Sequence, residues 1–528
     1  METDMHDQSA GASSRIAQLA DLLEGGELVI DGDERAYFSQ DYFAEGPLPE
    51  AILKPKTIAE LAKVVSAATA KGLAIYPRGG GFSYTDGYIV TKPGITIDMR
   101  SMNRIIEINA EDMYVTVEAG CTWAELDEAL AKHGLRTPFW GPMSGRNATV
   151  GGGASQGAIS FGSARHGLSA DTIIGLTVVT VDGRIIRTGS GAQPNHSPFF
   201  RNYGPDLTGL LCGDCGALAI KAEVSLRLIE RPKHVEGMSF GFSSFANYSA
   251  AAAAVARQGL VTESIGTLAE TVTDHASQGG LIDGLKALRQ VIGASSSLRT
   301  GLARAAKIAF AGRKFAQKFE LLLHVVVEGP DEQSVAIQAN HVRRAVSELG
   351  AEIANTVPTM LRAEPFPSYD MLSLTGQRQL PPSTILPFSK VTEFHEDLTR
   401  RMDARKDEME RLGVDVAPVF ATVGTSGFLY EIVITWDDTV GEFHRRHTNP
   451  DLITKVEGNA EAPDARKLAI DLRSDLVEAA YAHGGVHVQI GKVYPYARSR
   501  DEHALALLRS VKAQLDPHGL CNPGALGL

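Results

Sequence analysis

Three glycine-rich clusters that precede Ile220 constrain the fold of this chain more than any other feature. They are Pro77–Gly81, Gly151–Gly157 and Gly213–Gly216. Consecutive glycines leave backbone N–H groups with no side chains around them, and such concave stretches bind anions such as a pyrophosphate. Glycine accounts for 53 of the 528 residues, about 10% against a usual ~7%, and much of the excess lies in these clusters.

The net charge of the chain makes local anion sites necessary for any phosphate ligand. Lys and Arg number 51 against 63 Asp and Glu, which gives −12. Such a balance argues against a nucleic-acid partner or an anionic membrane surface. Two standard phosphate motifs are also missing, because no G-x-x-x-x-G-K-[ST] occurs and no cluster has G-x-G-x-x-G spacing between a strand and a helix. A dinucleotide would therefore depend on the backbone donors of the clusters.

The spacing of apolar residues predicts alternating strands and helices before residue 232. Capping boxes at Thr57–Glu60 and Thr122–Glu125 open two helices, which end near Gly72 and Gly134. A hairpin is expected from Thr172 to Thr188. Further strands are expected at 73–76, 95–99, 114–118 and 219–229.

From about residue 234 onward, the pattern of expected helices and strands indicates an α+β domain in which helices cover a sheet. Arg231-Pro232 is a plausible boundary, so we expect domains at 1–233 and 234–490 and a C-terminal segment at 491–528. Within the second domain, 279–312 is expected to be a surface insertion. Helices are expected at 332–349, 390–412 and 464–482, and strands at 319–328, 428–436 and 485–490.

The cysteines and the apolar runs favour a soluble cytoplasmic protein. Four cysteines are too few for a disulfide scaffold in a chain of this length. The N-terminal stretch 1–14 is acidic and polar and does not resemble a signal peptide. No apolar run is long enough for a membrane-spanning helix, so no membrane span is expected.

Five motifs in order along the chain carry a family resemblance. The five motifs are Pro77–Tyr84, Pro142–Ser144 with Ala148–Ala154, Arg165–Gly167, Gly213–Ile220 and Leu515–Gly524. This series resembles the vanillyl-alcohol oxidase/p-cresol methylhydroxylase (PCMH-type) FAD flavoprotein superfamily, with features of its D-lactate dehydrogenase/glycolate oxidase branch. The resemblance implies a PCMH-type FAD-binding domain of two subdomains, roofed by an α+β cap whose antiparallel sheet is covered by helices.

The resemblance also implies which residues bind FAD. The backbone amides of the first two loops would take the pyrophosphate, and the third loop and the C-terminal tail would complete the site. The residues carried over in this way are Pro77, Arg78, Gly79, Gly80, Gly81, Phe82, Ser83, Tyr84, Pro142, Ser144, Thr149, Val150, Gly151, Gly152, Ser155, Gly157, Gly216, Ile220 and Asn522.

Departures from the family pattern bear on covalent attachment and metal binding. Phe82 stands where one branch has the histidine that carries a covalent flavin, and Asn147-Ala148 stands where the paired cysteine is expected. We therefore expect non-covalent FAD. The metal-binding motifs of the hydroxy-acid branch are replaced by Gly424–Tyr430 and Gly485–Gln489, so we expect no divalent metal.

A short segment near the C-terminus holds the candidate catalytic residues. Alternation in Val486–Ile490 predicts a strand with His487 and Gln489 on one face. His487 is the candidate proton acceptor, and a structural histidine or a flavin anchor is the alternative. Lys492 and Tyr494 are candidate contacts to substrate or flavin, with a solvated rim as their alternative.

These residues predict an FAD-linked oxidoreductase that dehydrogenates a small hydroxylated substrate by hydride transfer to the flavin. Both a 2-hydroxy acid and a benzylic or phenolic alcohol are open, and Arg362 or Arg378 could pair a carboxylate. One alternative is a group-transfer or bond-rearranging enzyme of the alkylglycerone-phosphate-synthase type, and another is a flavin-binding protein without turnover. The electron acceptor (oxygen, a quinone or a cytochrome) is open, as is assembly into a homodimer.

Overall fold

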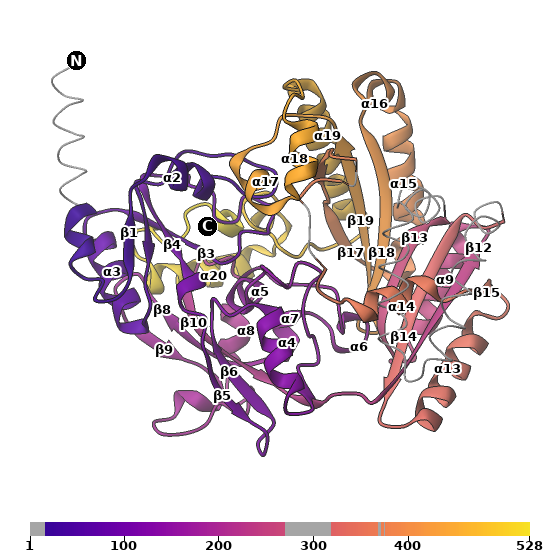
Figure 1. The fold of residues 1–528 in the computed structure, drawn as a ribbon, viewed down its shortest axis with the longest axis horizontal. Helices are drawn as coiled ribbons and strands as arrows, with labels where there is room; N and C mark the ends of the chain where they lie inside the picture. The colour runs from indigo at the N-terminus through magenta and orange to yellow at the C-terminus, as the bar shows by residue number, and fades with distance from the viewer. Residues whose placement is uncertain (1–15, 270–317, 368–370, 374) are drawn as a thin grey trace.

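The N-terminal part of the chain is built on two sheets that share a core. The computed structural model describes residues 16–269, 318–367, 371–373 and 375–528 (Figure 1). The first sheet has the order β1-β2-β4-β3, in which β2, β4 and β3 run parallel. Its elements are β1 (Glu27–Val29), α2 (Gly32–Phe38), β2 (Ala51–Lys54), α3 (Ile58–Ala70), β3 (Ala74–Arg78) and β4 (Gly94–Asp98).

The second sheet is antiparallel, with the order β5-β6-β10-β8-β9. Val179 and Ile220 from this sheet pack with Leu53 and Ile75 from the first, which joins the two sheets into one core. The elements of this region are β5 (Ile105–Asn109), β6 (Tyr114–Glu118), α4 (Trp123–Ala131), β7 (Leu135–Arg136), α5 (Val150–Gln156), α6 (Ser163–His166), α7 (Ser169–Thr172), β8 (Ile173–Val179), β9 (Ile185–Arg187), α8 (Leu207–Leu211), β10 (Ile220–Arg227) and β11 (Ile229–Glu230).

The cap is a large antiparallel sheet with the order β15-β12-β14-β13-β18-β19-β16, to which β17 adds by pairing with β19. Apolar residues of four helices, α9, α13, α15 and α19, bury one face of this sheet. The strands are β12 (His234–Phe242), β13 (Val261–Leu268), β14 (Leu321–Gly329), β15 (Ala351–Ile353), β16 (Arg378–Leu380), β17 (Ser383–Pro387), β18 (Asp415–Val423) and β19 (Gly427–Trp436).

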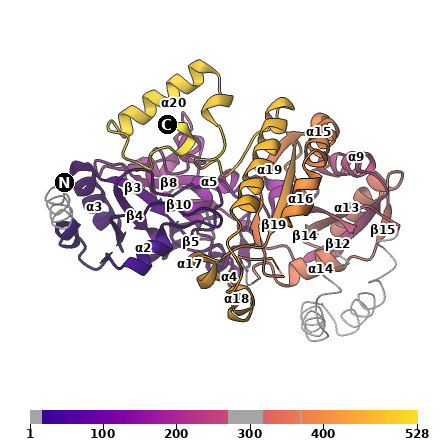
Figure 2. The ribbon, with the colours of Figure 1, turned by 90° about the horizontal axis from the view of Figure 1, so that it is seen from above.

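Helices α9, α13, α15 and α19 cover one face of the cap sheet, whereas α17 contacts α2 of the N-terminal part (Figures 1 and 2). The opposite face of the sheet looks toward the glycine clusters, because Glu263, Phe420 and Glu431 line one cavity together with Phe82 and Ser144. The helices are α9 (Phe245–Ala256), α13 (Glu332–Val346), α14 (Thr356–Ala363), α15 (Val391–Asp403), α16 (Lys406–Leu412), α17 (Glu442–His447), α18 (Pro450–Val456) and α19 (Pro463–Ala482).

The C-terminal segment returns to the N-terminal part after the cap. Helix α20 (Glu502–Leu515) lies over that part in Figure 2, far from the cap strands. Beyond α20, Cys521 bridges Ile75 of β3 in parallel, and the Asn522 N–H donates to the Ile75 carbonyl at 2.8 Å. The tail thus lies alongside the strand that leads into the first glycine cluster. The α+β class expected from the sequence is confirmed, with two subdomain sheets and a cap whose antiparallel sheet is covered by helices.

Of the two capping boxes expected from the sequence, one forms completely and the other only in part. At α4 the box is complete, since Thr122 and Glu125 each accept from the backbone of the other. At α3, Thr57 accepts from the Glu60 N–H, but the Glu60 carboxylate accepts from Lys56 and Gly25 instead of closing the box. This difference arises because Glu60 is buried, which makes its carboxylate available to a second segment of chain.

The predicted strand at 485–490 is wrong. Val486 forms a single bridge with Ile385, and the chain then turns, with Gln489 at φ +53° and Gly491 at φ +56°. A left-handed residue breaks the alternation on which the prediction relied, because it turns successive side chains out of register. Among the described residues, no helix combines the length and the apolar character that a membrane crossing needs. The N-terminal stretch 1–14 and the predicted insertion at 279–312 lie outside the described residues.

Candidate active site

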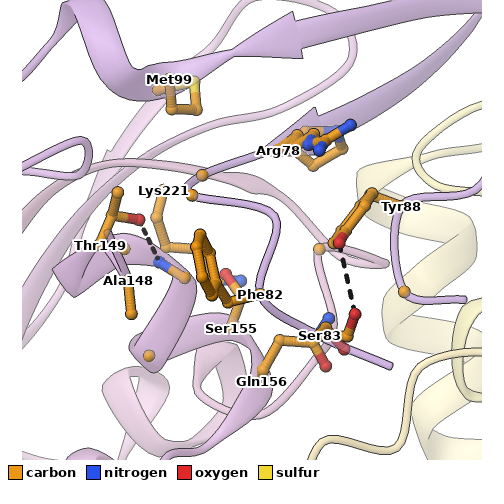
Figure 3. Close-up of a pocket in the computed structure, with 18 of the residues that line it drawn as sticks. Arg78, Phe82, Ser83, Tyr88, Met99, Ala148, Thr149, Ser155, Gln156 and Lys221 are labelled. Carbon is orange, nitrogen blue, oxygen red and sulfur yellow. Dashed lines mark hydrogen bonds between the residues drawn. The ribbon is translucent and has the colours of Figure 1, made fainter. Parts of the chain in front are cut away.

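The three glycine clusters meet around one cavity, which we call the loop cavity (Figure 3). The first cluster begins in the last two residues of β3, the second makes up most of α5, and the third precedes β10. Most residues expected to bind FAD line this cavity. They are Pro77, Arg78, Gly79, Gly80, Gly81, Phe82, Ser83, Pro142, Ser144, Thr149, Gly151, Gly152, Ser155, Gly157, Gly216 and Ile220.

Three of the residues expected to bind FAD lie elsewhere. Val150 is fully buried in the core beneath the second sheet. The Asn522 side chain is buried and donates to the carbonyls of Gly87 and Cys215, each at 2.6 Å, so it fixes the shape of the cavity from behind. Tyr84 lines a neighbouring cavity.

Close contact between the first two loops explains why they are built from glycine. A Cβ added at Gly80 would lie 2.0 Å from the Asn147 carbonyl oxygen, and one at Gly79 would lie 2.3 Å from the Thr149 hydroxyl oxygen. By contrast, a Cβ at Gly152 would meet one atom within 4 Å, the Thr149 hydroxyl oxygen at 3.2 Å. Gly79 and Gly80 are therefore required by the protein itself, and Gly152 leaves space for a ligand.

Arg78 places a buried positive charge on the wall of the loop cavity. Its guanidinium lies 4.7–4.8 Å from the ring centroids of Tyr37, Phe38 and Tyr88, and Nη1 donates to the Tyr37 carbonyl at 3.1 Å. Nη2 is buried and has no hydrogen-bond partner in the described chain. A buried cation with a free donor calls for an anion.

The third loop is shaped by a buried ion pair at the same cavity. The Asp214 carboxylate accepts from the Gly216 N–H at 2.9 Å and from the Lys221 ammonium. Lys221 and Cys215 both line the cavity. Burial raises the pKa of the Cys215 thiol to about 12, so the Cys212–Cys215 pair does not present a reactive thiolate here.

Several residues that line the loop cavity were not predicted from the sequence. Gln156 lies inside the second cluster but was not singled out, and Tyr88 and Met99 come from outside all five motifs. Gln489 comes from the end of the second domain, just before the C-terminal segment, where the sequence drew attention to His487 instead. A glycine pattern gives no signal for residues that reach the cavity from another part of the chain.

A second cavity, the cap cavity, lies between these loops and the open face of the cap sheet. It shares Phe82, Pro142, Ser144 and Gln489 with the loop cavity, so the two cavities adjoin. The remaining lining residues are Tyr42, Tyr84, Met143, Ile159, Ser160, Phe161, Ser163, Ala164, Glu263, Ser264, Ile265, Gln379, Pro381, Val419, Phe420, Ala421, Thr422, Leu429, Glu431 and Val433.

The two acids of the cap cavity are in different electrostatic environments. Glu263 accepts from the Thr262 hydroxyl at 2.8 Å and from Arg362 at 3.1 Å, so its charge has a partner. Glu431 lies in the middle of β19, opposite Ser383 of β17 and Val419 of β18. Burial raises the pKa of Glu431 to about 8, and no charged group offsets the effect. Perturbed acids in clefts are characteristic of catalytic sites.

The three predicted catalytic residues are absent from the lining of both cavities. The His487 Nδ1–H donates to the Ser383 carbonyl at 2.8 Å, and the ring stacks on Tyr494 with centroids 4.1 Å apart. The Tyr494 hydroxyl accepts from the Ser383 N–H at 3.0 Å. Lys492 donates to the Ile89 carbonyl, and burial lowers its pKa to about 8. These contacts tie residues 487–494 to β17 and to the chain that follows the first loop. The catalytic role of the three residues stays a prediction.

The two arginines considered for a substrate carboxylate are both engaged elsewhere. Arg362 donates to Glu263 and, at 2.9 Å, to Glu328. Arg378 is buried and donates to the carbonyls of Thr439 and Phe43, each at 3.0 Å. Neither lines the cap cavity.

The loop cavity has the glycine-rich backbone and the buried cation that a phosphate-bearing ligand such as a dinucleotide needs. Family models bear this out: a FAD-binding domain matches residues 49–189, and the C-terminal domain of FAD-linked oxidases matches residues 231–526, more than half of the chain. The chain belongs to the FAD-linked oxidase family. FAD is its cofactor, and the free donor of Arg78 and the open space at Gly152 fit the phosphates of that group.

Relatives and solved structures agree with this assignment. The chain is 32% identical over 222 residues to a mitochondrial D-lactate dehydrogenase [cytochrome] of Arabidopsis thaliana, which is 42% of this chain and 37% of that protein. It is 30% identical over 186 residues to a glycolate oxidase subunit of Bacillus subtilis, 35% of this chain and 38% of that one. The matched stretches thus span less than two fifths of either relative.

Two solved structures share the fold along nearly the whole chain. p-Cresol methylhydroxylase with substrate bound superposes with a TM-score of 0.71 at 16% identity, covering 98% of this chain and 97% of that one. An alkyldihydroxyacetonephosphate synthase superposes with a TM-score of 0.67 at 18% identity, covering 97% and 84%. At such identities the likeness concerns the fold alone.

Proposed function

We propose that this protein is an FAD-dependent oxidoreductase that dehydrogenates the CH–OH group of a small molecule bound in the cap cavity. The observation that carries this proposal is the junction of the two cavities through Phe82, Pro142, Ser144 and Gln489. A substrate in the cap cavity is thereby next to the ligand of the loop cavity. The hydroxy-acid dehydrogenases among the relatives support the reaction class.

Dehydrogenation of an alcohol separates a hydride from a proton. When bound, FAD supplies the acceptor for the hydride, which leaves the carbon with two electrons. The hydroxyl proton goes to a base of the protein as the C=O bond forms. The cap cavity must therefore present a proton acceptor to the hydroxyl group.

Glu431 is the residue best placed to accept that proton. It lines the cap cavity between Leu429 and Val433, which line it as well. A carboxyl whose pKa is raised to about 8 holds a proton strongly once it has taken it, which suits a base working near neutral pH. His487, the proton acceptor predicted from the sequence, contacts Ser383 and Tyr494. We propose that it positions β17 and Tyr494.

The FAD is held without a covalent bond in this proposal. Phe82, at the position of the covalent histidine in one branch, packs edge-on against Phe443 and His447 with centroids 5.7 and 5.0 Å apart. Acid precipitation should leave the FAD in the supernatant. A coloured pellet would show a covalent anchor, and absorbance of the two fractions settles the matter.

The test of the function is anaerobic reduction of the flavin. The absorbance spectrum of the purified holoenzyme is followed during addition of 2-hydroxy acids and of benzylic and phenolic alcohols. Bleaching of the flavin bands by either class supports the dehydrogenase. Bands that no member of the panel bleaches contradict it and favour a transfer reaction or a protein without turnover.

The sequence also leads us to propose the size of the substrate, the candidate electron acceptors, the assembly state and the location of the protein. The substrate is a small molecule, the electron acceptor stays open among oxygen, quinone and cytochrome, and a homodimer and a cytoplasmic location stay predictions. The group-transfer alternative draws its support from a shared fold at 18% identity, which is not evidence for a shared reaction.

A further inference from the structure

Resting on the proposed function, we propose that the substrate is an uncharged alcohol with an apolar body, and that the cap cavity excludes 2-hydroxy acids. The observation is the charge of the cavity wall. Its described lining residues include the carboxyl groups of Glu263 and Glu431 and no lysine, arginine or histidine. A substrate carboxylate would enter without a counter-ion and next to two acids.

The nearest cations are not free to change this balance. Arg136 and Arg362 both bind Glu328, and Arg362 also binds Glu263, so two cations and two acids neutralise one another. The guanidinium groups of both arginines also lie over the Trp140 ring, 5.2 and 5.0 Å from its centroid. Withdrawing either arginine to meet a ligand would leave a buried carboxylate without its partner, which is strongly destabilising.

Glu431 decides the preference because it has no partner within the described chain. It forms no hydrogen bond or ion pair there, although it is half-buried at the centre of the sheet face. A buried polar group without a partner costs free energy unless a ligand satisfies it. In its ionised form this carboxyl group accepts a hydrogen bond from a neutral hydroxyl group and repels a ligand carboxylate.

The rest of the wall fits an apolar body. Tyr42, Phe82, Tyr84, Phe161 and Phe420 contribute aromatic surface from four separate segments of the chain. Aliphatic side chains of Met143, Ile159, Ile265, Leu429 and Val433 fill the space between them. Burial of an apolar ring or alkyl chain against such surface is favourable by roughly 25 cal/mol per Å².

A matched set of substrates separates this inference from the proposed function. Mandelate, 1-phenylethane-1,2-diol and 2-amino-1-phenylethanol share one secondary alcohol and one phenyl ring, and differ in a carboxylate, a hydroxymethyl or an aminomethyl group. Lactate, propane-1,2-diol and 1-aminopropan-2-ol form the same series without the ring. Each is mixed anaerobically with the holoenzyme as a racemate, and the rate of flavin bleaching is measured.

We expect the diol to reduce the flavin at least 100-fold faster than the acid in the phenyl series. An acid that matches or exceeds its diol overturns the inference and leaves the dehydrogenase standing. Faster reduction by the amine also overturns it, in favour of a cationic substrate. If none of the six bleaches the flavin, the proposed function itself fails, and the inference fails with it.

Two variants test whether the wall charge is the cause. Glu431→Gln removes the uncompensated acid, and Gln379→Lys adds a cation to the same cavity from β16. The dissociation constant of mandelate is read from its perturbation of the flavin spectrum at pH 9. Each variant should bind mandelate at least tenfold more tightly than the parent protein, and unchanged or weaker binding in both overturns the inference. FAD content checks that each variant is folded.

Discussion

The two adjoining cavities are built by opposite means. Nine of the residues that line the loop cavity are glycines, and the cations Arg78 and Lys221 lie on its wall. The cap cavity has no glycine and no cation among its described lining residues, and it carries two acids. In a protein of net charge −12, the two cations that line these cavities are therefore both in the loop cavity. The cap cavity is apolar and acidic.

The largest effect that we predict is the loss of FAD when a bulky side chain fills the loop cavity. Gly152→Phe should abolish FAD retention with the fold intact, because a Cβ at this position meets little protein. Gly80 is a poorer test, since its Cβ would collide with the Asn147 carbonyl whether or not FAD is bound. Flavin absorbance and circular dichroism of the purified variant measure the two properties.

Gly32→Phe serves as the matched control. Gly32 lies at the start of α2, is exposed, and has no heavy atom within 4 Å of the Cβ that would be added. This control should keep its FAD. A Gly152→Phe protein that stays yellow would contradict the placement of the cofactor in the loop cavity.

The next effect concerns the acid of the cap cavity. Glu431→Gln should slow anaerobic flavin reduction by roughly 10²–10⁴-fold, the span of a lost general base, with FAD still bound. Stopped-flow absorbance gives the rate. Glu410→Gln, on the exposed side of α16, is the control and should reduce at the parent rate. An unchanged rate in Glu431→Gln would remove that residue from the mechanism.

The pH dependence of reduction follows from the same carboxyl group. Its pKa is raised to about 8, so below pH 8 the ionised, proton-accepting fraction falls about tenfold per pH unit. Reduction at low substrate concentration should therefore rise roughly 10²-fold from pH 6 to pH 9. Around Glu431 stand Glu263, Tyr42 and Tyr84 on the cavity wall and Tyr494 behind it, and burial raises the pKa of Tyr494 to about 12.

The Glu431→Gln variant tests whether Glu431 is the group that titrates. Glu431→Gln should flatten the profile between pH 7 and pH 9. A profile with the same rise in the variant would assign the titration to another group. A midpoint below pH 6.5 would point to His487, whose pKa burial lowers.

A smaller effect tests the cationic wall of the loop cavity. Arg78→Met should weaken FAD binding about 10–100-fold, because a hydrogen bond from a charged donor contributes about 1.5–3 kcal/mol. Arg100→Met is the matched control, since Arg100 lies near the same rings of Tyr37 and Phe38 but pairs with Asp98 at 2.8 Å. Titration of apo-protein with FAD measures both. Equal losses in the two variants would reduce Arg78 to a packing role.

The smallest effect is expected at His487. Because it contacts Ser383 and Tyr494 rather than either cavity, His487→Ala should slow flavin reduction less than tenfold. His487→Gln keeps a donor for the Ser383 carbonyl and should recover part of the loss. A loss of roughly 10²–10⁴-fold with FAD retained would restore His487 as the proton acceptor predicted from the sequence.

The amino-acid sequence alone was sufficient to locate the glycine clusters and the elements that carry them. The Gly79–Gly81 run, the Thr122 capping box and the hairpin of β8 and β9 are local, since each depends on residues within a few positions of one another. Local patterns survive in a single sequence because backbone geometry dictates them. The tertiary structure then brings the three glycine clusters together around one cavity.

The residues that line the cap cavity became known from the tertiary structure and could not be predicted from the sequence. Leu429 and Glu431 lie on the same face of β19, and buried residues alternate with them along the strand. This alternation is the same whether the face is turned to a cavity or to solvent. Gln489 replaced His487 at the cavity because a left-handed turn broke the expected strand. Arg362 was lost as a carboxylate partner because Glu263 and Glu328, distant in sequence, already bind it. Contacts between distant segments set these outcomes, and a one-dimensional pattern does not record them.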